Sequence, residues 1–259
     1  MLSSDSTASP AFMVTERALQ LGADNLASLH RDARLAFALG SSNWLDATAT
    51  PRCSFERIAL AIFEARTREV EFERDRAGVE WWAQVRREGH SDEAIQLHWD
   101  VDEYHCDRHD VNVQPWLSNV LYLTDEGAPT LVLNVRAPRS NADIQKHTYG
   151  MIPDGWLSWP SVGKRDSRLV LISCAASAVV SFHGNFLHGT FPGARRSPDG
   201  VAPSPRPDVC RVTLLVNIWL GHIPSHIEPL PSSLASTMSQ AWATYAARTE
   251  QLRRHHACL

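Results

Sequence analysis

The sequence predicts a mainly β domain with flanking helices, an α+β arrangement whose strands form a sandwich or a barrel. Towards both ends of the chain, apolar residues recur at spacings near three and four, which is typical of amphipathic helices. Between about residues 79 and 220 the period changes to two in several short segments. Many short strands with turn signals between them favour a sandwich or barrel over a βαβ sheet.

Three helices are expected around the strands. The first begins at a Thr15 cap and ends near Leu39, before a Gly-Ser-Ser-Asn cluster. The second begins at a Ser54 cap and the third covers residues 232 to about 256. In the second helix, three apolar residues face inward (Ile58, Ile62 and Phe63) and four charged residues face outward (Glu56, Arg57, Glu64 and Arg66).

Strands are expected at residues 79–85, 95–99, 118–124, 130–135, 168–173, 178–182 and 211–220. Residues 125–129 form a good hairpin turn, with Gly127 where a positive φ is required. Two long inserts interrupt the pattern: we expect residues 136–167 to pack over the active site and residues 193–208 to be mobile. The domain division follows as a disordered tail at 1–12, a single domain at 13–231 and a packed C-terminal helix at 232–259.

Composition narrows the class of protein. The net charge of −4 and a pI near 6.3 provide no strong basic field, so no nucleic-acid partner is expected. Five cysteines, an odd number without a CxxC pair, indicate reduced thiols. The N-terminus lacks a signal-peptide pattern, and the longest apolar run, 169–182, is too short for a bilayer. A soluble cytoplasmic protein without a membrane partner is expected, and no pattern specifies an oligomeric state.

The first candidate for chemistry is His98-Trp99-Asp100, which follows an apolar strand pattern. On a strand, residues two apart share a face, so the imidazole and the carboxylate can bind one metal ion. A surface pair has the same sequence, and His105 with Asp107 repeats the spacing nearby. We favour His98 and Asp100 because His105 lies in a polar run, and the second pair remains the rival.

A second imidazole comes from residues 182–189, which contain His183 and His188. His188 follows a glycine-containing turn and an apolar pair, at the start of a new strand, and is favoured. A buried histidine bonded to the backbone would explain either residue alone.

Arg211 begins the apolar strand 211–220, and a charge there must end in solvent or on a partner. Arg211 and Thr213 share a face of the strand. The guanidinium and the hydroxyl can therefore hold one carboxylate together.

Taken in order, these motifs resemble the Fe(II)/2-oxoglutarate-dependent oxygenases over roughly residues 80–220. Two imidazoles and one carboxylate occupy one face of an octahedral Fe(II) and leave the other face open for a chelating co-substrate and O2. The resemblance implies a double-stranded β-helix core (jelly roll, cupin-like) with flanking helices. It implies metal ligands His98, Asp100 and His188, a 2-oxoglutarate clamp of Arg211 with Thr213, and a further co-substrate hydrogen bond from Tyr122. The gap between His188 and Arg211 is longer than usual for the family, and the loop 193–208 accounts for it.

The implied enzyme is a non-haem iron dioxygenase that decarboxylates 2-oxoglutarate to succinate and oxidises a C–H bond. Asp100 fills the metal position that related halogenases use for halide, so hydroxylation or desaturation is expected. A small molecule is the expected substrate, in a pocket lined by residues 136–167, residues 104–110 and the N-terminal helices. The alternatives are a protein side-chain hydroxylase and a cupin-like metal-binding protein without oxygenase turnover.

Overall fold

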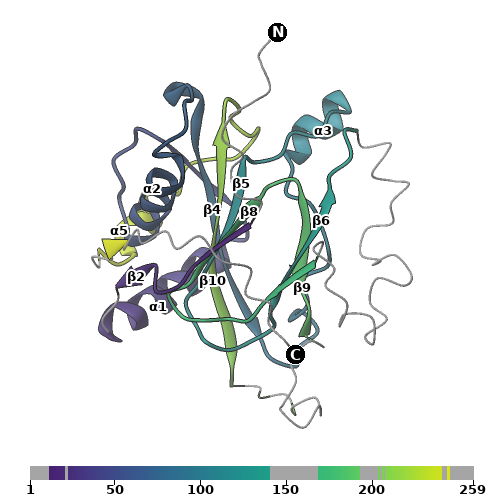
Figure 1. The fold of residues 1–259 in the computed structure, drawn as a ribbon. Coiled ribbons are helices and arrows are strands. Elements are labelled where there is room, and N and C mark those ends of the chain that lie inside the picture. Colours follow the sequence, from purple (N-terminus) through teal and green to yellow (C-terminus); the bar gives the residue numbers. More distant parts are fainter. Residues whose placement is uncertain are drawn as a thin grey trace.

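Two antiparallel sheets dominate the computed structural model, which describes residues 12–20, 23–140, 169–192, 204, 206, 208–240 and 244–245 (Figure 1). The larger sheet contains, in spatial order, β1 (Phe12–Thr15), β8 (Val179–His183), β5 (Leu117–Tyr122), β10 (Cys210–Leu220), β4 (Ala77–Arg87) and β3 (Asn43–Asp46). The smaller sheet contains β7 (Leu169–Ile172), β6 (Thr130–Arg136) and β9 (Phe186–Thr190). A short pair joins β2 (Leu19–Gln20) to β11 (Thr244–Tyr245).

Few helices accompany the sheets. They are α1 (Ala23–Leu39), α2 (Ser54–Thr67), the 3-10 turn η1 (Arg74–Arg76), α3 (Glu103–His109) and α5 (Ser232–Thr237). The expected mainly β architecture with flanking helices is therefore confirmed. None of the helices in the described part of the chain has the length and apolar character needed to cross a bilayer.

Side-chain alternation gives the larger sheet one apolar and one mixed face. On β10 every second residue is buried in the main apolar cluster (Val212, Leu214, Val216 and Ile218). Helices α1 and α2 pack on this face, over β4 and β10. Across the contact, the ring of Phe55 on α2 meets Trp81 on β4 edge-on at 5.9 Å between centroids. This apolar layer supplies the main stabilisation, about 1.5–3 kcal/mol for each large side chain that is fully buried.

The opposite face of the larger sheet carries polar residues. Arg211, Thr213 and Asn217 alternate with the apolar residues of β10 and are all buried. In Figure 1 the smaller sheet lies on this side, away from α1 and α2. Buried polar groups need partners, and this face therefore identifies the region where a ligand would be held.

The expected helix start at Thr15 is wrong. Thr15 ends β1 and pairs with Val179 of β8, and α1 begins only at Ala23. Between them Arg17 adopts a positive φ of 48°, and Ala18 and Leu19 are buried. Strand pairing at the edge of the larger sheet satisfies the backbone of residues 12–15, which overrides their local helical spacing.

Helix α2 begins at Ser54 as expected, and its inward residues Ile58, Ile62 and Phe63 are buried. The Ser54 hydroxyl does not cap the helix, because it donates to the carbonyl of Ser239 at 2.8 Å. The expectation that Glu56 faces outward is wrong. Its carboxylate is fully buried and accepts from the Arg52 guanidinium at 2.6 Å, which offsets the cost of burial.

The expected long C-terminal helix is also wrong. It starts at Ser232 but ends at Thr237, and Met238 is extended and buried. The fully buried Asp32 of α1 accepts a hydrogen bond from the Ser239 backbone N–H at 2.8 Å, which draws the chain out of the helix. Tyr245 then pairs with Leu19, and residues 246–259 lie outside the described residues.

The other expected strands are present except at residues 95–99, where only an isolated bridge between His98 and His188 forms. Strand β3 was not expected. Gly127 has the positive φ expected for its turn, 110°. The tail at 1–11, the insert at 141–168 and most of 193–207 lie outside the described residues.

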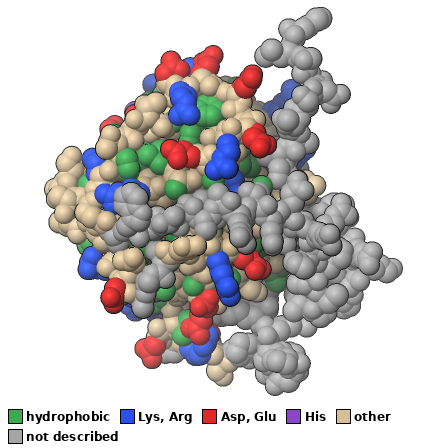
Figure 2. Space-filling view, turned by 60° about the vertical axis from the view of Figure 1, so that its left-hand side comes forward, with side chains coloured by type: hydrophobic (Ala, Val, Ile, Leu, Met, Phe, Trp, Pro, Cys, Tyr) green, Lys and Arg blue, Asp and Glu red, His purple; other side chains and the backbone are tan. Residues whose placement is uncertain are grey.

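Figure 2 shows one face of the molecule, on which acidic and basic side chains are interspersed among small hydrophobic patches. The four described cysteines (Cys53, Cys106, Cys174 and Cys210) are free thiols.

Replacing Phe55 by alanine tests the layer between α2 and the sheet. Because the ring is fully buried against Trp81, the free energy of unfolding should fall by about 3–5 kcal/mol. Urea denaturation measures this as a lower midpoint at an unchanged slope. The control Glu73→Ala, at a side chain that is 70% exposed, should change it by less than about 0.5 kcal/mol. A Phe55→Ala loss below about 1 kcal/mol would contradict this packing.

Candidate metal centre

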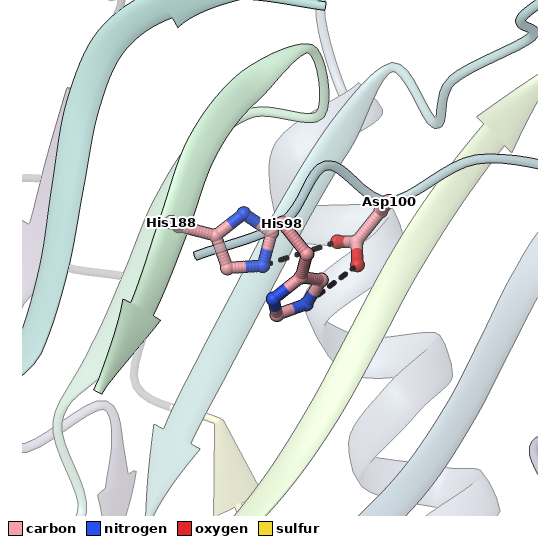
Figure 3. Close-up of side chains that lie close together, drawn as sticks. All are labelled: His98, Asp100 and His188. Atoms are coloured by element: carbon pink, nitrogen blue, oxygen red, sulfur yellow. Dashed lines mark ion pairs between the residues drawn. The ribbon is translucent and has the colours of Figure 1, made fainter. Parts of the chain in front are cut away.

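His98, Asp100 and His188 lie together on the inner side of the two sheets, and their side chains point toward one another (Figure 3). Nε2 of His98 is 3.6 Å from Oδ1 of Asp100, and Nε2 of His188 is 3.6 Å from Oδ2. The ligand atoms of all three lie within 4.8 Å of one another, the only such group of three found among the described residues. Two ligands at right angles around an ion, each about 2.1 Å away, lie about 3 Å apart, so a small contraction completes this site.

The backbone fixes this meeting of distant segments. His98 and His188 exchange two hydrogen bonds, each N–H donating to the other's carbonyl at 2.9 Å. The pair continues the smaller sheet beyond β9. Between the two ligands of the first motif, Trp99 points the other way, and its ring N–H donates to the carbonyl of Val135 at 2.9 Å. Gly189 is needed here, because a Cβ would lie 2.6 Å from the carbonyl oxygen of Ile95.

Both imidazoles are oriented by their second nitrogen. Nδ1 of His98 lies 2.8 Å from the carbonyl of Gln96, and Nδ1 of His188 lies 3.0 Å from that of Phe186. A carbonyl can only accept, so the neutral form of each ring carries its proton on Nδ1 and leaves Nε2 for a metal ion. Such partners fix the tautomer that a metal requires.

Asp100 is held ionised. Burial opposes its charge, but the facing imidazoles of His188 and His98 and the hydroxyl of Ser118 hold the pKa of the carboxyl well below its usual range. The Ser118 hydroxyl donates to Oδ2 at 2.6 Å. Burial lowers the pKa of His188 and outweighs the attraction of Asp100, which favours the neutral, metal-binding imidazole. At His98 burial acts in the same direction, but Asp100 outweighs it and the pKa is raised.

The rival residues do not join this group. His105 and Asp107 lie on α3, a helix, where residues two apart point to different sides. The His105 ring instead lies near those of His109 and His222, at 4.5 and 5.4 Å between centroids. His183 ends β8, and its ring packs against Phe186.

A second polar group surrounds Arg211, which is 2% exposed. Its guanidinium donates to the hydroxyls of Thr130 at 2.9 Å and of Thr213 at 3.3 Å. The hydroxyl of Tyr122 donates to the hydroxyl of Thr130 at 2.6 Å. The centre of the Tyr122 ring lies 5.4 Å from the guanidinium carbon of Arg211. Burial raises the pKa of Tyr122 to about 12, against the opposing charge of Arg211, so the phenol stays a donor.

Arg211 forms no ion pair with any described carboxylate, and its buried Nε has no hydrogen-bond partner there. An uncompensated buried guanidinium is costly, and an anionic ligand would supply the missing charge. The structure therefore brings the expected residues Arg211, Thr213 and Tyr122 into one group with the electrostatics of a carboxylate site.

Three contributing residues were missed in the sequence. Ser118 shares a face of β5 with Tyr122, a relation that period-two alternation would have revealed. Thr130 begins β6, and a strand-initial threonine carries no distinguishing pattern. Gly127 was expected only as a turn residue, but a Cβ there would lie 2.4 Å from Cβ of Arg211.

A cavity of about 520 Å³ has two of the three candidate ligands, His98 and Asp100, in its wall. Its remaining wall comes from the inner face of β4, the end of α1 and the start of α3. Of the residues expected to line a substrate pocket, Ala36 and Phe37 of α1 and Tyr104 line this cavity, whereas residues 105–110 and α2 do not. The insert 141–168 lies outside the described residues.

In sequence, no protein-family model and no curated protein matches this chain. Among solved structures, similar ones include a Pseudomonas putida prolyl-4-hydroxylase (15% identity, 83% of this chain and 90% of that chain, TM-score 0.43). Another is HygX from Streptomyces hygroscopicus with nickel and 2-oxoglutarate bound (14% identity, 86% of this chain and 88% of that chain, TM-score 0.45). A third is the non-heme alpha ketoglutarate dependent carbocyclase SnoK from nogalamycin biosynthesis (12% identity, 86% of this chain and 90% of that chain, TM-score 0.41). Identities and TM-scores this low do not by themselves place the chain in a family.

Ligand replacement tests the metal centre. His98→Ala and Asp100→Ala should each weaken Co(II) binding by more than about 100-fold, since even outer partners of metal ligands account for about 10- to 100-fold. Ser118→Ala, which removes such an outer partner, should weaken it about 10-fold. Isothermal titration calorimetry on metal-stripped protein measures these affinities.

His105→Ala is the matched control and should leave Co(II) affinity unchanged. A loss of binding in that variant, with binding retained in His98→Ala, would move the site to the rival pair.

Proposed function

We propose that this protein is a non-haem Fe(II)/2-oxoglutarate-dependent oxygenase that hydroxylates a C–H bond of a small molecule. The observation that carries the proposal is the pairing of two sites on one inner face. One is the group of His98, Asp100 and His188, and the other is the buried Arg211, which has no ion-pair partner among the described residues. The first is a site for a divalent metal with open positions, and the second is a site for a carboxylate.

The donor set fits Fe(II). Imidazole nitrogen and carboxylate oxygen are ligands suited to this ion, and two histidines with one carboxylate are the facial set of non-haem iron oxygenases. Both Nε2 atoms are available, because each Nδ1 is engaged with a backbone carbonyl. Among the described residues only these three meet as protein ligands, so open positions remain for co-substrate and O2.

Arg211, Thr213 and Tyr122 would hold the far carboxylate of 2-oxoglutarate. The guanidinium supplies the countercharge, while the hydroxyls of Thr213 and Tyr122 lie beside it as further donors. With iron bound, the site would supply decarboxylation of 2-oxoglutarate to succinate and oxidation of a C–H bond by O2. The chain's own residues orient the co-substrate, exclude water from it and keep Asp100 ionised.

The strand order supports a double-stranded β-helix, or jelly roll, of the cupin-like kind. From β4 onward the chain passes between the larger sheet (β4, β5, β8 and β10) and the smaller one (the His98 bridge, β6, β7 and β9). Strand β10 lies between β4 and β5, so distant segments become neighbours. Such crossing over between two antiparallel sheets is characteristic of jelly rolls.

A small-molecule substrate is favoured because the cavity of about 520 Å³ beside the ligands has the size of ordinary ligand pockets. Asp100 occupies the third ligand position, which favours hydroxylation over halogenation. The competing functions are a protein side-chain hydroxylase and a metal-binding protein without turnover. The experiments below distinguish an oxygenase from the metal-binding protein without turnover.

The decisive experiment needs no substrate. Metal-stripped protein is mixed with Fe(II) and 2-oxoglutarate without oxygen, and the visible charge-transfer band of the chelate is recorded. We expect a band in the wild type and in His105→Ala, and none in His98→Ala. Metal binding without a band in the wild type would overturn the oxygenase and favour the cupin-like alternative.

Arg211→Gln tests the clamp. Loss of a charged hydrogen bond is worth about 1.5–3 kcal/mol, so the dissociation constant for 2-oxoglutarate should rise about 10- to 150-fold while Fe(II) affinity is unchanged. Titration of the same band gives both values. Arg87→Gln, at an exposed end of β4, is the control and should bind both normally. Equal weakening of Fe(II) and 2-oxoglutarate would argue against a clamp.

A further inference from the structure

The cavity beside the metal centre has an acidic wall that the proposed reaction does not use. Glu80 lies on the inner face of β4 and lines this cavity together with His98 and Asp100. It pairs in register with Asn217 of β10, which in turn pairs with Ser118 of β5. Since paired residues point to the same face, a polar row runs across three strands from Glu80 to Ser118, whose hydroxyl bonds Asp100.

Glu80 is held in place by neutral donors. The indole N–H of Trp219 donates to its Oε2 at 3.1 Å, and Ser42 and Asn217 also bond the carboxyl. Among the described residues no lysine, arginine or histidine forms an ion pair with it. Burial raises the pKa of Glu80 to about 7, the hydrogen bond from Ser42 opposes this shift, and the charge of Asp100 adds to it. A cation placed beside Glu80 would compensate that charge.

The same wall has the chemistry of a cation site. Trp82 follows Glu80 on the same face of β4, and Phe37 and Tyr104 also line the cavity. Aromatic faces attract ammonium groups, and a carboxylate beside them supplies the opposite charge. Next on this face, Gln84 has a buried Oε1 without a hydrogen-bond partner among the described residues, so it offers a second acceptor.

The basic residue of the cavity wall lies far from this point. Arg86 is six positions along β4 from Glu80, about 20 Å at the usual strand rise. Its guanidinium stacks 5.4 Å from the centre of the Phe37 ring and lies 3.7 Å from Asp92. Asp102, the neighbouring acid, is engaged by His222 and the N–H of Ser225. Glu103 is exposed to solvent, so Glu80 is the half-buried carboxylate of the wall whose charge is left for a ligand.

We propose that the substrate carries an amine, protonated when bound, and that Glu80 is the specificity-determining residue that receives this ammonium group between the aromatic walls of the cavity. The inference rests on the proposed function, because it takes this cavity as the substrate site. It narrows the substrate class from any small molecule to amines with an apolar or aromatic body.

The test uses 4-fluorobenzylamine as the probe and 4-fluorobenzyl alcohol as its neutral match, each followed by fluorine NMR on the metal-free full chain. The wild type should bind the amine about 10- to 100-fold more tightly than the alcohol, the range for a hydrogen bond to a charged group. Glu80→Gln keeps an acceptor for Trp219 and should abolish this preference. Glu103→Gln, at an exposed acid of the same cavity, is the matched control and should preserve it.

Equal binding of the two probes by the wild type, no binding of the amine, or an unchanged preference in Glu80→Gln would each overturn the proposal. The wild-type comparison stands even if a variant does not fold. The anaerobic Fe(II) and 2-oxoglutarate band is recorded on the same samples and should be retained in Glu80→Gln. Because the amine is measured without metal, absence of that band would refute the oxygenase, while absence of the preference would refute only the amine.

Discussion

The alternation of side chains along β10 is the constraint on which both the stability of this protein and its candidate site depend. One set of residues, including Val216 and Ile218, is buried beneath α1 and α2, and the other set, including Arg211 and Asn217, faces the inner side. A shift of one residue in its pairing with β4 or β5 would exchange the two sets. The apolar face therefore enforces the register that places Arg211 beside Tyr122.

The candidate metal centre depends on a single bridge at the edge of the smaller sheet. The reciprocal hydrogen bonds of His98 and His188 join segments from distant parts of the chain, and Gly189 leaves room for their approach. Because the two ligands are paired through their backbones, the distance between the imidazoles is set by sheet geometry more than by rotamers. Rigid elements position a metal centre more precisely than loops do.

The inner face also carries opposite charges without matching protein partners among the described residues. On the inner face, Arg211 of β10 has no anionic partner and Glu80 of β4 has no cationic partner among the described residues. Each costs folding free energy, since an isolated buried charge loses its hydration. In a binding site this loss of folding free energy increases ligand affinity, because a ligand of the opposite charge stabilises the buried group when it binds. The same low-dielectric surroundings that penalise an unpaired charge also strengthen its interaction with an oppositely charged ligand.

Local pattern was sufficient for much of the site and the strands. His98, Asp100 and His188 were found from residue type and spacing, because ligands two apart on an extended segment share a face. Most strands were placed by period-two alternation, and Gly127 by the turn it permits. The rival pair His105 and Asp107 lies on α3, whose helical geometry separates residues two apart and disfavours a shared metal ion.

Tertiary structure decided the rest, wherever a distant partner outweighed local preference. Thr15 lies in a strand because Val179 offers it a backbone partner, and the C-terminal helix stops near Asp32 because that carboxylate takes the N–H of Ser239. Glu56 is an exception, because the residue that compensates its buried charge, Arg52, is only four positions away. The roles of Ser118, Thr130 and Glu80 also required the fold, since none has a local pattern and each depends on which strand becomes its neighbour. Sequence alone thus determined the ligand types and strand periods, whereas cross-strand register determined which polar groups share one inner face.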